Sequence, residues 1–451
     1  MESAADISVH DYVAWALADI EAGRLRELEA ALADLHPAEV ADLLEAMPPE
    51  QRSLLWQAVP VEQESEVLPN LHDEARASII VEMDDAELVA AAERMDVEDL
   101  AWVIEELPQD LSDTILDALE QDHRARLEAV LAYDEGTAGR LMSTDVLSVR
   151  PGASLAVVLR WLRRHARLPP HTDALMVIDT EGTYQGKLPL DVVLTGEPDA
   201  KVADMMQPAA EVVRAGASEH EVAALFDRRD LISVAVLDDQ DQLLGRITVD
   251  DVIDIIRQEA DHALLKSAGL DEDEDLFAPV LPSAKRRGVW LGINLITVFM
   301  AAWVIGQFEE ALDKIVALAV LMPVVASMGG IAGSQTLTLT IRGMALDQIA
   351  DANVRWLTIK ELAVGGLNGV VWAVVVAAVA FAWFRDPGIA VIIAVALVLN
   401  LLAASLSGVA VPLVLKRMGI DPALSGAVIL TTVTDVIGFL SFLGLASVFL
   451  L

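Results

Sequence analysis

Five long apolar stretches end the chain and are almost free of charged residues. They run over 288–307, 315–341, 362–384, 388–415 and 423–451. A helix needs about 20 apolar residues to cross the hydrocarbon core of a bilayer, and each stretch is long enough. Burial of five such segments in succession inside a soluble core is a poor alternative. The pattern therefore predicts an α-helical transmembrane domain of five spans over 285–451.

Short helices with an amphipathic period are expected over the first part of the chain. Residues 36–48 and 95–108 each open with an acidic cap region, continue with apolar residues at i, i+3 and i+4, and end at a proline. The recurrence predicts an all-α N-terminal domain of stacked helices over 1–133. Alone, this domain suits a spacer or a protein-interaction array and reveals no function.

Two copies of one βαββα unit follow, over 137–199 and 201–260. Each has an apolar strand, at 174–178 and 232–237, then an acidic turn, a second strand and a closing helix. The arrangement resembles a tandem CBS pair, an α/β module that we place at 134–260. Such pairs commonly bind adenine nucleotides such as ATP, and the resemblance assigns Thr248 and Asp251 to the ribose. A rigid dimerising module with an empty cleft is the alternative.

One amphipathic helix is expected to continue from Val249 to Leu270, and the acidic run 271–275 follows it. We assign 250–284 to a connecting helix and linker that overlap the end of the second CBS unit. A long helix that joins a sensor module to a membrane domain is a plausible mechanical link.

Charge separates the chain into two parts. Residues 282–451 contain 10 Lys and Arg and 9 Asp and Glu, which leaves 21 basic and 61 acidic residues in 1–281. So acidic a part excludes nucleic acid as a partner, because phosphate binding needs a basic surface. The chain has no cysteine, so thiolate metal sites and disulfides are excluded.

Loop charges predict the orientation in the membrane. Basic residues cluster before the first span, between the second and third, and between the fourth and fifth. By the positive-inside rule the N-terminus is cytoplasmic and the C-terminus lies outside the inner membrane. Residues 1–10 show no signal-peptide pattern, which agrees with a cytoplasmic first half.

Asp435 is the strongest candidate for chemistry inside the membrane. Counted from Ala423 at ~1.5 Å per residue, it lies ~18 Å deep, near the middle of the bilayer. A carboxylate at that depth is costly and usually functional. Thr431 and Thr432 share its helix face. The alternative is a helix–helix hydrogen bond or a neutral buried acid.

The second span contains a proline and three glycines that are also candidates for the pore. Pro323 removes a backbone donor, and Gly329, Gly330 and Gly333 allow close helix approach or exposure of carbonyls to a pore. Packing alone would explain the glycines, but it does not explain Gln335 and the hydroxyl residues beside them. A lone acid near the membrane centre, without Cys or His in the spans, indicates a hard and hydrated divalent cation. This reasoning does not separate Mg²⁺ from Mn²⁺ or Co²⁺.

The whole order resembles the MgtE family of magnesium channels. Three motifs carry the resemblance: 323–335 with its glycines, Ile420-Asp-Pro-Ala-Leu424, and Thr431 to Gly438 around Asp435. The resemblance implies a homodimer with the pore between its membrane domains, and Asp435 as the selectivity carboxylate for Mg²⁺. It also implies a plug helix that closes the pore when cytosolic Mg²⁺ binds.

The resemblance further implies a set of acidic residues that bind the regulatory Mg²⁺. These are Glu98, Asp99, Asp227, Asp230, Asp251, Asp254, Glu259 and Asp421. Three positions depart from the family pattern: Ile331 replaces an amide after the paired glycines, His262-Ala263 replaces an acidic pair, and Trp102 replaces an acid.

The expected mechanism is electrostatic. Clustered carboxylates repel and open the gate, and bound Mg²⁺ screens them and closes it. The chain has no Walker-type loop and no catalytic constellation, so we expect neither ATP-driven pumping nor an enzyme. Two alternatives remain open. One is a secondary transporter of another divalent cation, and the other is a membrane-anchored nucleotide sensor.

Overall fold

The computed structural model describes residues 9–105, 107–165, 167–208, 210–267, 269–270, 275–346 and 348–451. The chain forms two compact units. The acidic unit contains residues 1–261 and 273–279, and the apolar unit contains residues 262–272 and 280–451. The last part of the connecting helix thus belongs with the predicted spans, while residues 275–279 of the linker belong with the acidic unit.

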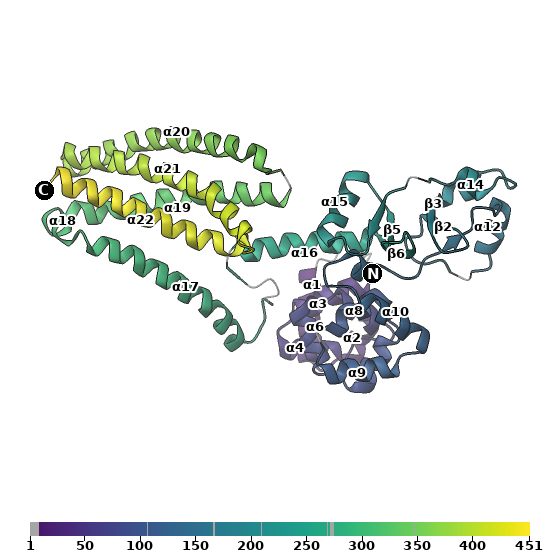
Figure 1. Ribbon diagram of the computed structural model, residues 1–451. Coiled ribbons are helices and arrows are strands. Elements are labelled where there is room, and N and C mark those ends of the chain that lie inside the picture. The colour runs from purple at the N-terminus through teal and green to yellow at the C-terminus, as the bar shows by residue number, and fades with distance from the viewer. Residues whose placement is uncertain are drawn as a thin grey trace. The chain divides into compact units, whose positions relative to one another are not determined.

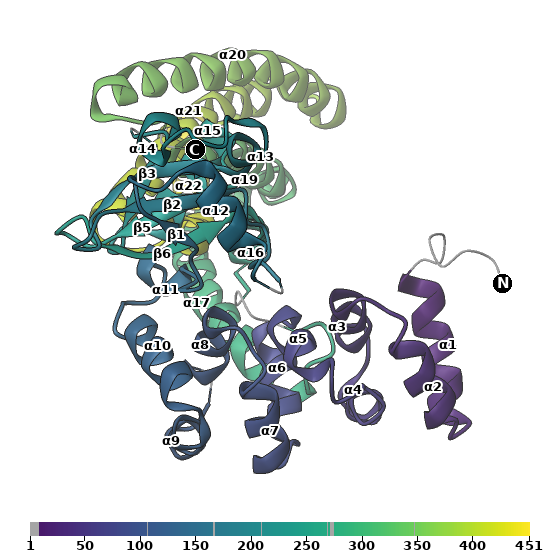
Figure 2. The same ribbon diagram turned by 90° about the vertical axis from the view of Figure 1, so that its right-hand side faces the viewer.

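Short helices stack in an arc at the start of the acidic unit, as Figure 2 shows. They are α1(Val9–Glu21), α2(Leu25–Leu32), α3(Pro37–Glu45), α4(Pro49–Trp56), α5(Glu64–Val67), η2(Leu68–Asn70), α6(Asp73–Ile80), α7(Asp85–Ala92), α8(Val97–Glu105), α9(Gln109–Ala118) and α10(Gln121–Leu131). Proline starts α3 and α4, where its fixed φ suits the first turn and its missing N–H is not needed. Such short helices are marginal alone. They are stabilised by a shared core that includes Leu28, Leu44, Leu68 and Leu100.

Two small sheets of the same topology follow, as the sequence repeat predicts. The first copy contains α11(Ala138–Leu141), β1(Ser148–Val149), α12(Leu155–Leu162), β2(Ala174–Ile178), β3(Tyr184–Pro189) and α13(Leu190–Thr195). The second contains α14(Val202–Met205), β4(Val212–Arg214), α15(Glu219–Arg229), β5(Ser233–Leu237) and β6(Leu243–Thr248). In each sheet the middle strand pairs parallel with the first strand and antiparallel with the third. The register shifts at equivalent points, Val177/Ile178 and Val236/Leu237, so the duplication extends to the backbone.

The connecting helix is α16(Val249–Ser267), which leaves β6 directly. Thr248 lies just before its first residue, and its backbone N–H donates to the Asp251 Oδ2 atom at 3.0 Å. This contact satisfies one backbone group at the helix start. Val252 and Ile255 are buried against the core of the acidic unit, whereas Leu264 in the later part is exposed.

The apolar unit consists of long helices. They are α17(Val280–Gly306), α18(Glu309–Lys314), α19(Val316–Ala345), α20(Asp351–Phe384), α21(Pro387–Arg417) and α22(Pro422–Phe449). Five of these helices are long and apolar enough to cross a membrane, which confirms the predicted spans. Asp386 and Asp421 accept backbone N–H groups at the starts of α21 and α22, where proline follows at the first helical position.

Helix α21 is the centre of the bundle and packs against α19, α20 and α22. Its side chains from Ile393 to Ala404 include many that are fully buried. Helix α17 packs against α22, and its first half diverges from the bundle in Figure 1. Leu295, Phe299 and Trp303 of α17 are more than half exposed. An apolar surface of this kind requires lipid or another protein to cover it.

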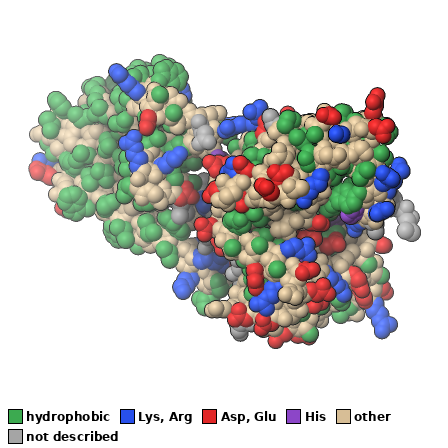
Figure 3. Space-filling model, turned by 45° about the vertical axis from the view of Figure 1, so that its right-hand side comes forward, with side chains coloured by type: hydrophobic (Ala, Val, Ile, Leu, Met, Phe, Trp, Pro, Cys, Tyr) green, Lys and Arg blue, Asp and Glu red, His purple; other side chains and the backbone are tan. Residues whose placement is uncertain are grey.

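The surfaces of the two units differ as their compositions do. On the face shown in Figure 3, hydrophobic side chains cover the apolar unit, and acidic and basic side chains cover the acidic unit. The predicted fold class is confirmed: an all-α N-terminal region, an α/β CBS pair, a connecting helix and a five-span α-helical region.

Candidate functional site

Asp435 lies at the middle of α22 and is half-buried. Within the part of the chain that the structure describes, its carboxylate has no hydrogen bond or ion pair. One turn earlier, the Thr431 hydroxyl donates to the carbonyls of Ala427 and Val428, both at 3.0 Å. The Thr432 hydroxyl donates to Val428 at 2.7 Å. These hydroxyls are turned toward their own helix, so only their oxygen lone pairs remain available to a ligand.

The glycines of α19 fall into two groups. A Cβ atom added at Gly329 would lie 2.2 Å from the Asn400 amide, and one at Gly333 would lie 2.9 Å from Leu430. Both glycines are therefore required by helix packing. A Cβ atom at Gly330 would meet nothing within 4 Å, and Gln335 is exposed. Only Gly330 and Gln335 of these predicted pore residues in α19 face open space.

Asn400 is a functional candidate that the sequence reasoning missed. This side chain of α21 is fully buried, and its Nδ2 atom donates to the Val325 carbonyl of α19 at 2.9 Å. Its Oδ1 atom is buried with no partner among the described residues. The amide fills the space between Gly329 and Gly438, one turn from Asp435. The available signal was a single amide side chain within the uncharged and largely apolar 388–415 stretch.

Glu361 is a second acid inside the apolar unit. It is buried on α20, and its Oε2 atom accepts a hydrogen bond from the Thr336 hydroxyl of α19 at 3.1 Å. Lys360 pairs with the other carboxylate oxygen. The sequence reasoning started the third span at Leu362 and so missed this acid, because α20 begins earlier, at Asp351.

An acidic cavity of about 280 Å³ lies between α8 and the start of α16 within the acidic unit. Predicted ligands from distant parts of the sequence meet here: Glu98 and Asp99 from α8, and Asp251 and Asp254 from α16. Other ionisable residues in its lining are Asp96, Asp145, Asp250, His123, His171, Arg126 and Arg246. Seven carboxylates therefore share one cavity with two arginines.

Burial and mutual repulsion raise the pKa values of these carboxylates. Burial raises the pKa of Glu98 to about 7 and that of Asp99 to about 8, and for Asp99 the neighbouring carboxylates add to the effect. Burial also raises the pKa of Asp251 to about 6, although Thr248 donates two hydrogen bonds to it. The pKa of Asp254 is raised as well, first by burial. Loss of hydration and like charge both disfavour the ionised form.

The carboxylates do not form a ready-made metal cage. No group of three or more such ligands converges on one point in the described ranges. A small hard cation would draw carboxylates together, or would be held through its own water shell. The same cavity contains Thr248, so the predicted nucleotide contact and the predicted metal ligand Asp251 lie in one place.

The other predicted regulatory acids lie elsewhere. Asp227 and Asp230 are exposed at the end of α15, and Glu259 lies 3.4 Å from the His220 ring. Asp421 starts α22 and lies 3.5 Å from the ammonium of Lys266. The predicted ligand at the membrane end of the connecting helix therefore already has a protein cation beside it.

Comparison with known proteins decides the family. Three family models match in chain order: the MgtE intracellular N domain at 35–136, a CBS domain at 202–258, and the MgtE divalent cation transporter at 322–445. The chain is 33% identical to the magnesium transporter MgtE of Thermus thermophilus over 336 residues, 74% of each chain. It is 28% identical to that of Bacillus subtilis over 335 residues, again 74% of each. The chain belongs to the MgtE family.

Solved structures agree for the acidic part of this MgtE-family chain. The cytosolic domain of the Mg²⁺ channel MgtE in complex with ATP is 29% identical, with a TM-score of 0.50, over 54% of this chain and 99% of that one. The relatives are magnesium transporters rather than enzymes. This MgtE-family protein is accordingly a multi-pass membrane protein of magnesium transport.

We predict that metal-free packing of α8 weakens as the pH rises. Folding raises the pKa values of Glu98 and Asp99, so their protonation stabilises the folded cavity fully below the ordinary carboxyl pKa of about 4. That contribution is lost as the pH rises through about 7 and about 8. Hydrogen exchange of α8 amides in full-length protein with a chelator, corrected for intrinsic exchange, should show falling protection.

The variant Glu98→Gln with Asp99→Asn is the control for this pH dependence. It should flatten the profile, because the amides do not titrate. Protection that rises with pH in the wild-type protein would contradict the assignment.

We predict that alanine destabilises the protein at Gly329 of α19 but not at the adjacent Gly330. Gly329→Ala forces a methyl group into the Asn400 amide, and such overpacking typically costs ~1–3 kcal/mol. Gly330→Ala adds a methyl group where nothing lies within 4 Å. Thermal unfolding of the purified protein should show a lowered midpoint for the first variant and an unchanged midpoint for the second. Equal midpoints would show that Asn400 does not fill this space.

Proposed function

We propose that the chain is a Mg²⁺-selective channel for magnesium uptake, closed by cytosolic Mg²⁺ that binds in the acidic cavity. The observation that carries the pore assignment is Asp435, a half-buried carboxylate at the middle of a membrane-spanning helix without a protein partner among the described residues. An ionised acid at mid-membrane costs ~2.5–3.5 kcal/mol even on the lenient insertion scale. A passing cation and its water shell offset that cost.

A preference for a hard, hydrated divalent cation such as Mg²⁺ is supported by the ligand types that the spans lack. Neither Cys nor His occurs in the spans, so a soft metal has no preferred ligand there. Mg²⁺ gives up its water reluctantly and is commonly held through several retained waters. The lone pairs of Thr431 and Thr432 on the same helix face support such a hydrated ion.

The pore itself is proposed to lie between two copies of the chain. Asp435 is partly exposed, so a second copy would place a second carboxylate opposite the first and double the charge that faces the ion. The exposed apolar side of α17 supports contact with lipid or with that second copy. A homodimer is also the usual form of symmetric assemblies.

Gating is proposed to act through α16. The acidic unit holds the start of this helix, where Asp251 and Asp254 line the acidic cavity. The apolar unit holds its last part, where Lys266 pairs with Asp421 at the start of α22. Mg²⁺ in the cavity would neutralise Glu98, Asp99 and the α16 acids together and stabilise the closed arrangement. A ligand shifts this equilibrium only by its preference for one state.

The orientation is supported by the basic residues that flank the spans. Arg417, the last residue of α21, lies 3.6 Å from Asp351 at the start of α20, so these two helix ends share one side of the apolar unit. Lys360 and Arg355 lie on the first turns of α20 at the same side. We infer that this side is cytoplasmic.

ATP is proposed as a modulator at the CBS pair, with contacts from Thr248 and Asp251. The similar solved cytosolic domain was captured with ATP. Here the Thr248 hydroxyl donates to the Asp251 Oδ2 atom at 3.0 Å, so a ribose would have to compete for both groups.

We predict that Asp435→Asn strongly reduces magnesium uptake. The amide keeps the volume of the side chain but removes the charge that attracts the cation, so the rate should fall about tenfold or more, the effect of losing ~1.4 kcal/mol of stabilisation. Growth rescue of a magnesium-auxotrophic strain and uptake into loaded vesicles measure it. Asp351→Asn, at a side chain 98% exposed in the same unit, is the matched control. Uptake by Asp435→Asn at the wild-type rate, or uptake that follows a proton gradient, would refute the channel.

We predict that neutralising the cavity raises the internal Mg²⁺ needed to close the pore. The variant Glu98→Gln with Asp99→Asn and Asp251→Asn should shift half-inhibition to about tenfold higher Mg²⁺, because three of the carboxylates that would bind the cation in the closed state are gone. Currents recorded against internal Mg²⁺ measure the shift. Asp227→Asn with Asp230→Asn, outside the cavity, should shift it less. An unshifted cavity variant would overturn the gating proposal.

A further inference from the structure

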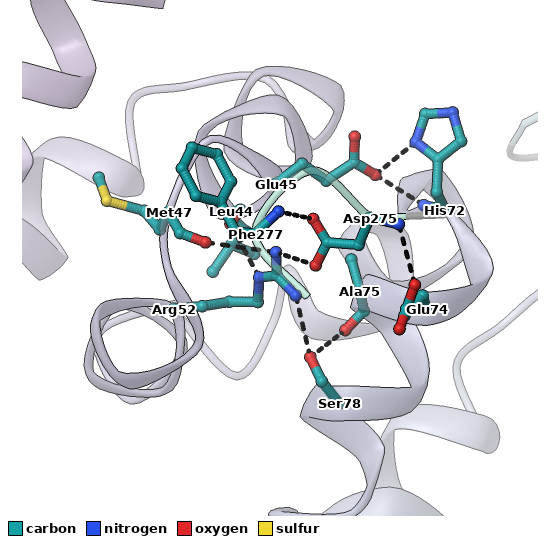
Figure 4. Close-up of polar contacts among 10 residues, drawn as sticks. All are labelled: Leu44, Glu45, Met47, Arg52, His72, Glu74, Ala75, Ser78, Asp275 and Phe277. Carbon is teal, nitrogen blue, oxygen red and sulfur yellow. Dashed lines mark hydrogen bonds and ion pairs between the residues drawn. The ribbon is translucent and has the colours of Figure 1, made fainter. Parts of the chain in front are cut away.

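Arg52 on α4 is an enclosed arginine within the N-terminal helical stack. Only 1% of the residue is exposed. Its Nε atom donates to the Leu44 carbonyl at 3.1 Å and its Nη1 atom to the Ser78 hydroxyl at 3.2 Å. Its Nη2 atom donates to the Met47 carbonyl at 3.2 Å and to the Asp275 Oδ2 atom at 2.7 Å (Figure 4).

Asp275 is the carboxylate that neutralises this arginine, although it lies 223 positions later in the chain. Its side chain is only 10% exposed. Its backbone N–H donates to the Glu74 Oε2 atom of α6 at 2.9 Å, and its Oδ1 atom accepts the backbone N–H of Phe277 at 2.8 Å (Figure 4). The segment is therefore bound by main chain and side chain at once, with both carboxylate oxygens in use.

Separation of Arg52 from Asp275 is costly, because each charged group would remain buried without its counter-ion. A buried guanidinium cannot lose its proton, and removal of its carboxylate leaves an uncompensated buried charge. The remaining acceptors of Arg52 are neutral carbonyls and a hydroxyl, so Asp275 supplies the only formal negative charge among the partners described for it. Removal of both charges together is much less disruptive than removal of either.

The position of Asp275 in the chain gives this ion pair a mechanical consequence. Asp275 follows the connecting helix α16, which ends at Ser267, and precedes α17, which begins at Val280. Five residues from Asp275 to Val280 span at most ~18 Å of extended chain. A displacement of the N-terminal helices that exceeds the slack of this short tether must pull on the first span.

We propose that the Arg52–Asp275 pair is a latch that couples the N-terminal helical stack directly to α17, in parallel with the route through α16. The proposal rests on the proposed gating by Mg²⁺. The N-terminal stack contributes Glu98 and Asp99 of α8 to the acidic cavity, and it binds the linker through Arg52 of α4. Cation binding in the cavity therefore restrains α16 and α17 together, and complete closure needs both restraints.

The test uses full-length protein and records uptake or current against internal Mg²⁺. Asp275→Asn removes the charge with little change in volume. Uptake that remains at saturating internal Mg²⁺ should rise several-fold, while half-inhibition, which reports the cavity, and selectivity, which reports the pore, should stay unchanged. Asp73→Asn is the matched control, because Asp73 pairs with the buried Arg76 on its own helix and has no hydrogen bond or ion pair to the described linker residues 275–279.

Because the chain has no cysteine, the latch can be rebuilt covalently. Arg52→Cys with Asp275→Cys should show the same residual uptake when reduced. A short bis-maleimide that joins the two thiols should restore complete inhibition. Rescue by the cross-link is expected if the pair is a mechanical link between the helical stack and the linker. It is not expected if the substitutions act only by destabilising the helical stack.

The outcomes separate the two proposals. A wild-type protein that internal Mg²⁺ does not inhibit would overturn the gating proposal and the latch with it. A wild-type protein that is inhibited, with Asp275→Asn inhibited as completely, would overturn the latch only. Residual uptake that persists after cross-linking would also overturn it.

Discussion

Repulsion between carboxylates that are partly removed from water is the constraint on which this molecule depends. In the acidic cavity, burial and like charge raise the pKa values of Glu98, Asp99 and Asp251 well above the ordinary carboxyl range. In the apolar unit, Asp435 stands at mid-helix without a protein cation among the described residues. Both places hold negative charge at a cost, and we propose that a divalent cation relieves that cost in both.

The two places differ in how the chain supports them. The cavity draws its acids from α8 and α16, so a bound cation would tie together elements that are distant in sequence. Asp435 is supported by close packing of α22 against its neighbours, with the Asn400 amide filling the space left by Gly329 and Gly438. Carboxylates drawn from two separate elements would suit the proposed sensor, which must change state, and a closely packed frame would suit the proposed pore site, which must hold one spacing.

At two other places, a lysine or arginine side chain neutralises a carboxylate in place of a metal ion. Lys266 lies beside Asp421 at the membrane end of the connecting helix, and Arg52 binds Asp275 in the linker. The first pair joins the end of the connecting helix to the start of α22, and the second joins the last residue of the 271–275 acidic run to α4. The negative charge of this protein is therefore balanced by fixed ammonium and guanidinium groups at some junctions and left for Mg²⁺, we propose, at the cavity and the pore.

The sequence by itself determined the class of fold and the place of Asp435 near the middle of its helix, because these follow from local pattern. Apolar length predicts spans, a repeated strand and helix order predicts the CBS pair, and a position counted along a helix needs no tertiary contact. The apolar period also located the connecting helix, although it did not show that its last part belongs with the spans.

Only the tertiary structure decided which acids meet. It brought Glu98 and Asp99 to Asp251 and Asp254 and left Asp227, Asp230 and Glu259 elsewhere, since the meeting depends on how α8 packs against the second CBS copy. It also turned Gly329 from a pore candidate into a packing residue by placing Asn400 against it, and revealed Arg52 with Asp275 across 223 positions. Contacts between residues so far apart follow from packing of whole elements, which no local pattern records.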